Sequence, residues 1–148
     1  MAIAVTVSAQ NFGRVKRVVD GDTLQLESGE RVRLIGVNTP ETKHPKKQVE
    51  YFGKEASAFT KRMVEGKLVR LEYDALAGGR DQKDRYKRTL AYVFLEDGMH
   101  LNEEIIKQGY GFAVSTRPPF LYQDGFRRLE REARENRRGL WADVKKEK

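Results

Sequence analysis

Short alternating runs of apolar residues, separated by glycine turns, constrain most strongly what this chain can fold into. From residue 12 to residue 37, apolar side chains recur at about every second position, and turns at Gly21 and Gly29 separate the runs. Such alternation is typical of strands with one buried face, and the turn residues tolerate the backbone conformations that tight antiparallel connections need. This segment is therefore predicted to form a three-stranded meander.

The middle of the chain is predicted to add a helix and two more strands. Apolar residues at helical spacing run from Phe52 to Met63, and Gly66 ends this helix. Alternation then predicts strands over residues 67–73 and 88–95.

Two further helices are predicted in the last third of the chain. Asn102 is expected to cap a short helix through Gln108. The last helix is expected to run from about Tyr122 to Arg138, with an inner face formed by Phe126, Leu129 and Ala133. Five short strands with a helix between the third and the fourth predict an α+β fold, a five-stranded OB-fold β-barrel of Greek-key type with three α-helices.

The composition excludes several classes of protein. The chain has 148 residues and no cysteine, and 29 Lys and Arg residues against 22 Asp and Glu residues give a net charge of +7. A chain without cysteine has no disulfide, no thiolate nucleophile and no cysteine zinc site. No apolar run approaches the roughly 20 residues of a membrane helix. The positive charge favours a polyanionic partner, either nucleic acid or an anionic membrane surface.

A single domain is predicted over residues 12–141, with a charged tail over residues 142–148. The segment 1–11 is interpreted as an exposed tail, an extra strand or the remnant of a secretory signal. The signal interpretation rests on Val7-Ser8-Ala9, which resembles a cleavage site.

Nucleophilic and zinc-dependent hydrolysis have little support in the sequence. There is no Gly-x-Ser-x-Gly motif, and the two histidines are His44 and His100. Two isolated histidines do not supply a three- or four-ligand zinc set. Both are predicted to be solvated surface residues, because His44 lies in a lysine-rich loop and His100 lies beside a turn.

Three polar segments carry the remaining chemical signals. The first, Asp20-Gly21-Asp22, is interpreted either as an ordinary turn or as an oxygen-ligand site for Ca²⁺ or Mg²⁺. The second places Arg33 in the middle of a barrel strand, where its charge has to pair or to bind an anion. The third, residues 83–88, surrounds one tyrosine with five charges and is either a solvated loop or a grip for phosphate.

Taken together, these segments resemble the staphylococcal nuclease (thermonuclease) family. The matching motifs are Asp-Gly-Asp-Thr from residue 20, Asn-Thr-Pro-Glu-Thr-Lys-His-Pro-Lys-Lys from residue 38, Asp-Arg-Tyr-Lys-Arg-Thr-Leu-Ala-Tyr from residue 84 and Arg-Gly-Leu-Trp from residue 138. The resemblance covers roughly residues 12 to 141. It implies a Ca²⁺-dependent, sugar-nonspecific endonuclease on an OB-fold barrel, which hydrolyses DNA and RNA to leave 3′-phosphate ends. The alternative is a non-catalytic nucleic-acid-binding module on the same barrel.

The resemblance also implies a metal site and a general base. Asp22 and Asn38 would be side-chain ligands of Ca²⁺, Thr39 would supply its backbone carbonyl, and Glu41 would orient or deprotonate the attacking water. The best-known family member has an aspartate where this chain has Asn38. Because calcium affinity depends on the charge of the ligands, weaker Ca²⁺ binding or the use of Mg²⁺ or another divalent cation is expected.

Residues that would contact the substrate follow from the same resemblance. Arg33 and Arg88 would hold the scissile phosphate, and Lys47, Arg85 and Tyr86 match positions that contact the substrate. The family's best-known member also presents two tyrosines to the base, where this chain has Ser115 and Arg117. Because stacking is worth about 1–3 kcal/mol per base, weaker substrate binding is expected unless Phe120, Tyr122 or the Arg117 guanidinium stacks in their place.

The resemblance further implies DNA and RNA as substrates and no stable protein partner, so a monomer is expected. Family members of this kind are often exported. An extracellular or cell-envelope location is therefore expected.

Overall fold

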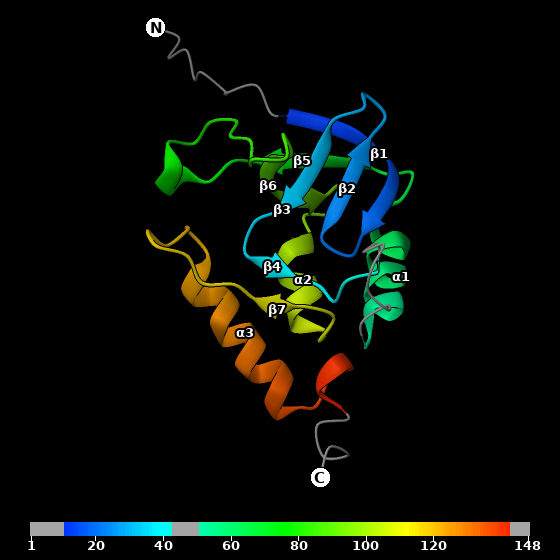
Figure 1. Cartoon of the computed structure of the whole chain (residues 1–148), viewed down its shortest axis with the longest axis vertical. Coiled ribbons are helices and arrows are strands. Elements are labelled where there is room, and N and C mark those ends of the chain that lie inside the picture. Colours follow the sequence, from blue (N-terminus) through cyan, green and yellow to red (C-terminus); the bar gives the residue numbers. More distant parts are fainter. Residues whose placement is uncertain (1–10, 43–50, 143–148) are drawn as a thin grey trace, which may run out of the picture.

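The structure, a computed structural model, describes residues 11–42 and 51–142 (Figure 1). Residues 1–10, 43–50 and 143–148 lie outside this description. They include almost all of the predicted N-terminal tail, His44, the expected substrate residue Lys47 and most of the charged tail. Among the described helices, none has the length and apolar character needed to cross a membrane.

A closed barrel forms the upper half of the molecule in Figure 1. Its strands are β1 (Asn11–Asp20), β2 (Thr23–Leu26), β3 (Arg31–Leu34), β5 (Leu68–Glu72) and β6 (Thr89–Leu95). They follow the order β1-β2-β3-β6-β5 around the barrel. Neighbours are antiparallel except for β3 and β6, which are parallel. With the three helices described below, this arrangement confirms the predicted α+β OB-fold barrel.

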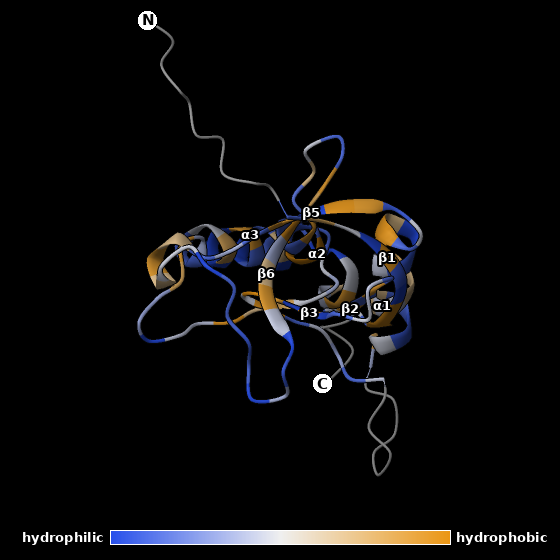
Figure 2. Ribbon diagram, turned by 90° about the horizontal axis from the view of Figure 1, so that it is seen from above, coloured by the Kyte–Doolittle hydropathy of each residue, from blue (hydrophilic) through white to orange (hydrophobic). Residues whose placement is uncertain are grey.

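Alternate apolar residues of β2 and β3 fill the barrel interior. Leu24 and Leu26 of β2 and Val32 and Leu34 of β3 are buried. Figure 2 shows hydrophobic residues along the strands and hydrophilic residues in the connecting loops. Each buried aliphatic side chain contributes about 1.5–3 kcal/mol, and a register slip of one residue would turn them all to solvent. The core therefore fixes which polar residues face outward.

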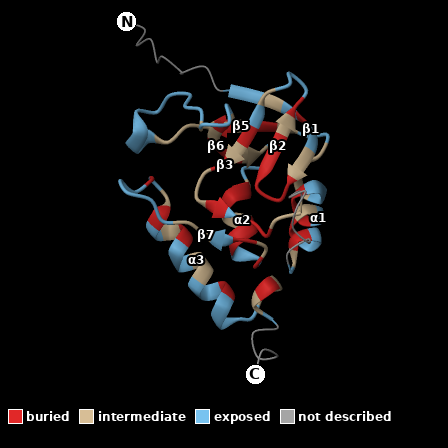
Figure 3. Ribbon diagram, in the orientation of Figure 1, coloured by how far each residue is buried: buried red, intermediate tan, exposed pale blue. Residues whose placement is uncertain are grey.

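Three α-helices lie against the barrel and against one another: α1 (Gly53–Val64), α2 (Leu101–Lys107) and α3 (Gln123–Glu135). Figure 3 shows that α2 is largely buried, whereas α3 keeps an exposed outer face. The predicted inner face of α3 is confirmed, because Phe126 and Ala133 are buried and Leu129 is half-buried. The helix ends earlier than predicted because Arg137 adopts a left-handed φ of 52°, which a right-handed helix does not continue.

Several short elements were not predicted. The strands β4 (Val37–Asn38) and β7 (Phe112–Ala113) form a separate antiparallel pair, and the 3₁₀ turns are η1 (Ala75–Ala77) and η2 (Gly139–Trp141). Elements of two or three residues are too short for their hydrophobic period to be recognised. The pairing of β4 with β7 fixes the backbone directly after β3.

Asn102 does not cap the short helix, contrary to the prediction. The N-cap residue of α2 is His100, which makes no side-chain capping bond. The Asn102 side chain is buried; it accepts a hydrogen bond from the Val93 N–H at 2.9 Å and donates to the carbonyls of Ile35 at 2.9 Å and Ala91 at 3.3 Å. An amide bonded in this way ties α2 to β6 and to the segment after β3.

His100 is buried, so the prediction of a solvated surface position was wrong. The residue is 8% exposed, and its ring stacks on Phe94 with 4.4 Å between ring centroids. Its Nε2 atom has no hydrogen-bond partner in the part of the chain that the structure describes. Burial, with a smaller contribution from the charge of Arg70, lowers the pKa of His100 to about 4. The ring of His100 packs against the aromatic rings of Tyr92, Tyr122 and Phe126. The position of the residue beside a turn in the sequence did not reveal this burial.

Acidification is expected to destabilise the protein through His100. Its folded pKa of about 4 lies below the ordinary value of 6.5, so the neutral ring stabilises the fold fully above pH 6.5. That stabilisation is lost as the pH falls from 6.5 towards 4, and the loss approaches about 3 kcal/mol. Two charged groups face the ring: Arg70, and Glu103 at 3.5 Å from Nδ1, whose own pKa burial raises.

Urea denaturation of the wild type and of His100→Phe across this pH range measures the effect. The free energy of unfolding of the wild type is expected to fall by about 3 kcal/mol more than that of the variant. All carboxylates are common to both proteins, so the difference isolates the imidazole. Parallel pH profiles of the two proteins would contradict the prediction.

Candidate functional site

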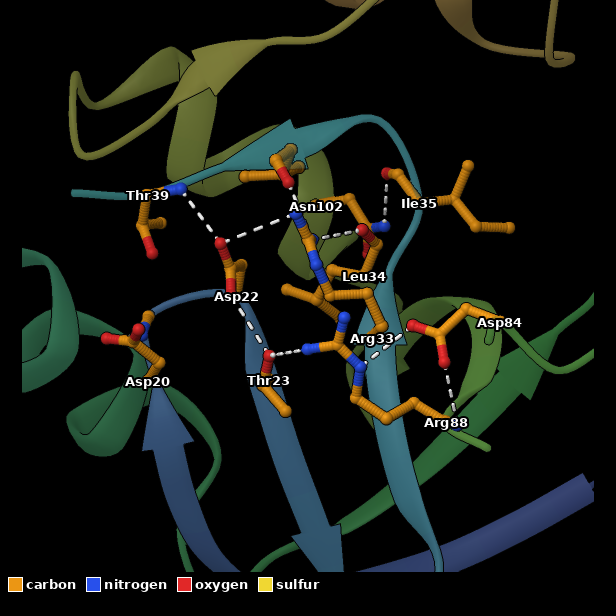
Figure 4. Close-up of polar contacts among 12 residues, drawn as sticks. Asp20, Asp22, Thr23, Arg33, Leu34, Ile35, Thr39, Asp84, Arg88 and Asn102 are labelled. Atoms are coloured by element: carbon orange, nitrogen blue, oxygen red, sulfur yellow. Dashed lines mark hydrogen bonds and ion pairs between the residues drawn. The ribbon is translucent and has the colours of Figure 1, made fainter. Parts of the chain in front are cut away.

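Among the predicted site residues, Asp22, Arg33, Thr39 and Arg88 lie close together (Figure 4). Thr23 pairs with Arg33, and Arg33 pairs in turn with Leu90. Asp22 directly precedes β2, and Arg88 directly precedes β6. Strand pairing therefore places both residues beside Arg33, although Arg88 is far from the other two in the sequence.

The Arg33 guanidinium is held by three acceptors. Its Nη1 donates to the carbonyls of Leu34 at 2.8 Å and Val37 at 2.7 Å, and its Nη2 lies 3.5 Å from Asp22 Oδ2. The side chain is 20% exposed. The expectation that this charge pairs is confirmed, and the planar group is fixed in orientation by acceptors on two sides.

Arg88 is anchored by an aspartate four residues earlier. Its Nε donates to Asp84 Oδ2 at 2.8 Å, and its Nη1 donates to the Thr23 hydroxyl at 3.5 Å. Asp84 also accepts the backbone N–H groups of Tyr86 and Arg88. Burial alone would raise the pKa of Asp84, but the hydrogen bonds from Arg88 and Tyr86 outweigh it and lower that pKa.

Asp22 connects the two arginines to the turn before β2. Its Oδ1 accepts the Thr23 hydroxyl at 3.0 Å, and its Oδ2 accepts the Thr39 N–H at 3.0 Å. The neighbouring Gly21 makes this approach possible, because a Cβ at that position would lie 2.7 Å from the Thr39 hydroxyl oxygen. Asp20-Gly21-Asp22 is thus a turn whose second carboxylate faces the arginines.

Two further carboxyl groups, those of Asp20 and Glu41, lie beside Asp22. Burial is the main cause that raises the pKa of Asp20 to about 6; a hydrogen bond with Glu41 and the charges of Asp22 and Glu41 add to it. The hydrogen bond from the Thr42 hydroxyl, at 2.7 Å, acts in the opposite direction. The site therefore has an acidic side at the end of β1 and a basic side formed by the two arginines.

The other predicted site residues that the structure describes, Asn38, Glu41, Arg85 and Tyr86, differ in their burial. Asn38 is exposed at the end of β4, next to the buried Thr39, and Glu41 is half-buried. Arg85 and Tyr86 are exposed on the loop before β6, where the Arg85 guanidinium donates to the Tyr86 hydroxyl at 2.9 Å.

Asp22 accepts the backbone N–H of Thr39, and Asn38 directly precedes Thr39 in the chain. Carboxylate, amide and backbone carbonyl oxygens, as on Asp22, Asn38 and Thr39, are ligands that Ca²⁺ and Mg²⁺ accept. The buried Thr39 hydroxyl has no hydrogen-bond partner in the described structure. Within residues 11–42 and 51–142, no group of three or more His, Asp or Glu side chains is arranged to hold a metal ion. A cation here would therefore depend on amide, backbone or water oxygens as well as carboxylate.

A pocket of about 430 Å³ opens beside Arg33 and Arg88. Its remaining wall includes apolar residues from η1 and from the segment before α3, namely Leu76, Ala77, Pro118, Pro119 and Phe120. The polar lining also includes Asp74 and Asp84, so the cavity combines arginine and aspartate side chains with an apolar wall.

Of the side chains expected to replace the family's two tyrosines, Phe120 lines this pocket. Tyr122 is engaged elsewhere: its hydroxyl donates to Glu72 at 3.1 Å, and its ring stacks on Phe126.

Sequence reasoning missed Asp84 and Thr23 as parts of this site. Asp84 pairs with Arg88 four residues later, but the intervening residues form a turn rather than a helix, so this spacing gave no reliable signal. Thr23 gave no signal either, because its contact with Arg88 depends on barrel closure.

The fold and the site together define a small OB-fold barrel with two anchored arginines facing a cluster of carboxylates. The family model described as "Staphylococcal nuclease homologue" matches residues 31–143. The chain belongs to the staphylococcal nuclease family.

Similar proteins agree with this placement. The chain is 41% identical over 133 residues to a protein named "Thermonuclease" from Staphylococcus hyicus. This match covers 88% of this chain and 75% of that protein. It is 44% identical over 130 residues to "Thermonuclease" from Staphylococcus intermedius, and this match covers 86% of this chain and 74% of that protein. It is also 36% identical over 130 residues to "Endonuclease YncB" from Bacillus subtilis, covering 85% of this chain and 59% of that protein.

Proposed function

We propose that this protein is a nuclease, specifically a Ca²⁺-dependent, sugar-nonspecific endonuclease that hydrolyses DNA and RNA and leaves 3′-phosphate ends. The observation that carries the proposal is the convergence of Arg33 and Arg88 beside Asp22, with the Glu41 carboxyl close by. The relatives named thermonuclease and endonuclease support the nuclease activity.

The two arginines stabilise the charge that develops during hydrolysis. Attack of water on a phosphodiester adds negative charge to its non-bridging oxygens. The guanidinium groups are held in place by Leu34 and Val37 for Arg33 and by Asp84 for Arg88. Because they are oriented before the substrate binds, little reorganisation is needed as the charge develops. Each guanidinium also offers paired N–H donors that match two phosphate oxygens.

Glu41 orients or deprotonates the attacking water from the acidic side of the site. A carboxylate in this role contributes about 10²–10⁴ to the rate. Asp22, Asn38 and Thr39 would hold the Ca²⁺ ion, which supplies Lewis-acid polarisation of the phosphate when bound.

Degradation of denatured DNA and of RNA tests the proposed function. The wild type is incubated with Ca²⁺, with Mg²⁺ or with a chelator, and the products are resolved by size and by sensitivity to a phosphatase that removes 3′-phosphates. Cleavage of both polymers with Ca²⁺ and its loss in chelator are expected. Full activity in chelator would overturn the metal requirement, and binding without cleavage under every condition would favour a non-catalytic nucleic-acid-binding module.

Replacing Asn38 by aspartate is expected to tighten Ca²⁺ binding. The variant adds one unit of negative charge to the proposed ligand set, and calcium affinity rises with ligand charge, here by roughly tenfold. Calorimetric titration measures the change. Asn11→Asp, which adds the same charge at an exposed position at the start of β1, serves as the control. Equal affinities of wild type and Asn38→Asp would show that residue 38 does not face the ion.

A further inference from the structure

A two-stranded sheet joins α3 to the site. Its strands β4 and β7 lie side by side in Figure 1, with Val37 opposite Ala113 and Asn38 opposite Phe112. β4 supplies two groups to the site: the Val37 carbonyl accepts Nη1 of Arg33 at 2.7 Å, and Asn38 is a proposed ligand of the cation. The placement of β4 therefore affects both the phosphate-binding side and the metal-binding side.

The paired residues Val37 and Ala113 direct backbone groups to partners outside this sheet. In an antiparallel pair, opposite residues alternate between those that exchange backbone hydrogen bonds and those whose N–H and C=O groups point away from each other. The Val37 carbonyl accepts the Arg33 guanidinium, whereas the Ala113 N–H donates to Oε2 of Glu130 at 2.7 Å. The carboxylate of Glu130 and the guanidinium of Arg33 thus hold the same residue pair from its two outer edges.

The Glu130 carboxylate has a partner for each oxygen. Its Oε2 accepts the Ala113 N–H, and its Oε1 lies 3.3 Å from Nη2 of Arg134. The guanidinium carbon of Arg134 lies in turn 4.4 Å from the centroid of the Trp141 ring. The Glu130 side chain is 17% exposed. Charge-assisted hydrogen bonds are short and directional, so these contacts fix the position of the carboxylate.

The sheet of β4 and β7 is short and depends on contacts outside it. Each strand has two residues, and beyond them the Val114 N–H donates to the Gly36 carbonyl at 3.0 Å. A two-stranded ribbon is at best marginally stable on its own. The bond from Ala113 to Glu130 attaches this ribbon to a helix that packs on the core through Phe126.

We propose that Glu130 is a positioning residue for phosphodiester cleavage: by holding β7, its carboxylate sets the place of the Val37 carbonyl and thereby the direction of the Arg33 guanidinium. This inference rests on the proposed nuclease function and extends it to a residue of α3 that acts through the backbone of β7 and β4. Arg33 acts on charge that develops during the reaction, so its displacement lowers the rate more than the affinity. A misplacement of about 1 Å can cost about 10²-fold in rate.

Three substitutions separate the reach of this side chain from its charge. Glu130→Gln keeps an acceptor oxygen at the same reach and removes the charge. Glu130→Asp keeps the charge but withdraws the carboxylate by one methylene group, and Glu130→Leu removes the acceptor. The matched control is Arg134→Gln, which breaks the ion pair at Oε1 and leaves the acceptor of the Ala113 N–H in place.

Steady-state cleavage of denatured DNA with Ca²⁺ is measured at a temperature at which circular dichroism shows every protein to be folded. Glu130→Asp and Glu130→Leu are expected to lose about 10–10²-fold in kcat, with KM changed by less than about threefold. Glu130→Gln and Arg134→Gln are expected to keep kcat within about threefold of the wild type. A purely structural role would lower the melting temperature and leave kcat of the folded molecules unchanged.

The comparison of Glu130→Gln with Glu130→Asp decides the test even where Glu130→Leu does not fold. Three results would overturn the proposal: a wild-type kcat in Glu130→Asp, a loss in Glu130→Gln as large as that in Glu130→Asp, or a rise in KM without a fall in kcat. Failure of the nuclease proposal is recognised separately, because it appears as the absence of cleavage by the wild type.

Discussion

Glu41→Gln is expected to lower kcat on denatured DNA by about 10²–10⁴, the contribution of a carboxylate that orients or deprotonates water. Glutamine has nearly the same shape, so the local packing is kept. The substitution also removes a negative charge beside Asp20, whose pKa the Glu41 carboxyl helps to raise. The melting temperature is therefore expected to be equal to that of the wild type or higher.

Steady-state kinetics and thermal denaturation of the same preparation separate the two effects. The control is Glu96→Gln, which makes the same chemical change at an exposed turn after β6 and is expected to leave kcat unchanged. A Glu41→Gln variant with full activity would falsify the role of Glu41 in water activation. Low activity with a lowered melting temperature would instead indicate a role in stability.

Arg88→Lys is expected to lower kcat by about 10²–10³, similar to the loss of one preorganised donor to a developing oxyanion. Lysine retains the positive charge but not the planar fork. Arg88 uses its Nε to bond Asp84 and directs Nη1 to Thr23, and a single ammonium group does not reproduce both contacts. The charge contributes to substrate attraction in both proteins, so KM is expected to change less than kcat.

Arg127→Lys, on the exposed face of α3, is the matched control for this exchange. Circular dichroism and the melting temperature verify that the barrel is intact in each variant. A kcat of Arg88→Lys within about twofold of the wild-type value would be a far smaller loss than that expected for a missing oxyanion donor. Such a result would show that the guanidinium geometry is not used in the reaction.

Strand alternation made the barrel and the position of Arg33 predictable. The buried apolar residues of β2 and β3 lie at every second position, so the outward direction of Arg33 and its need for a partner followed from the sequence. The partner itself, Asp22, is close in sequence and was among the residues singled out. Family resemblance then supplied roles for Asn38 and Glu41, which no local pattern indicates.

Other features depend on contacts between distant segments and gave no sequence signal. Asn102 looked like a helix cap because its residue type favours that position, but burial between α2 and β6 gave it backbone partners instead. His100 looked exposed because it follows a turn, yet packing covered it. The contact of Thr23 with Arg88 requires β2, β3 and β6 to be in place together.

The parallel pairing of β3 with β6 also determines when the site comes into existence. These strands are separated by α1 and β5 along the chain, so their pairing closes a long loop and is an entropically expensive step. A refolding molecule that has formed the β1-β2-β3 meander holds Asp22 and Arg33 but not Arg88. Recovery of catalytic competence during refolding is therefore tied to barrel closure, and a partly folded chain that has only its local hairpins lacks half of the phosphate-binding pair.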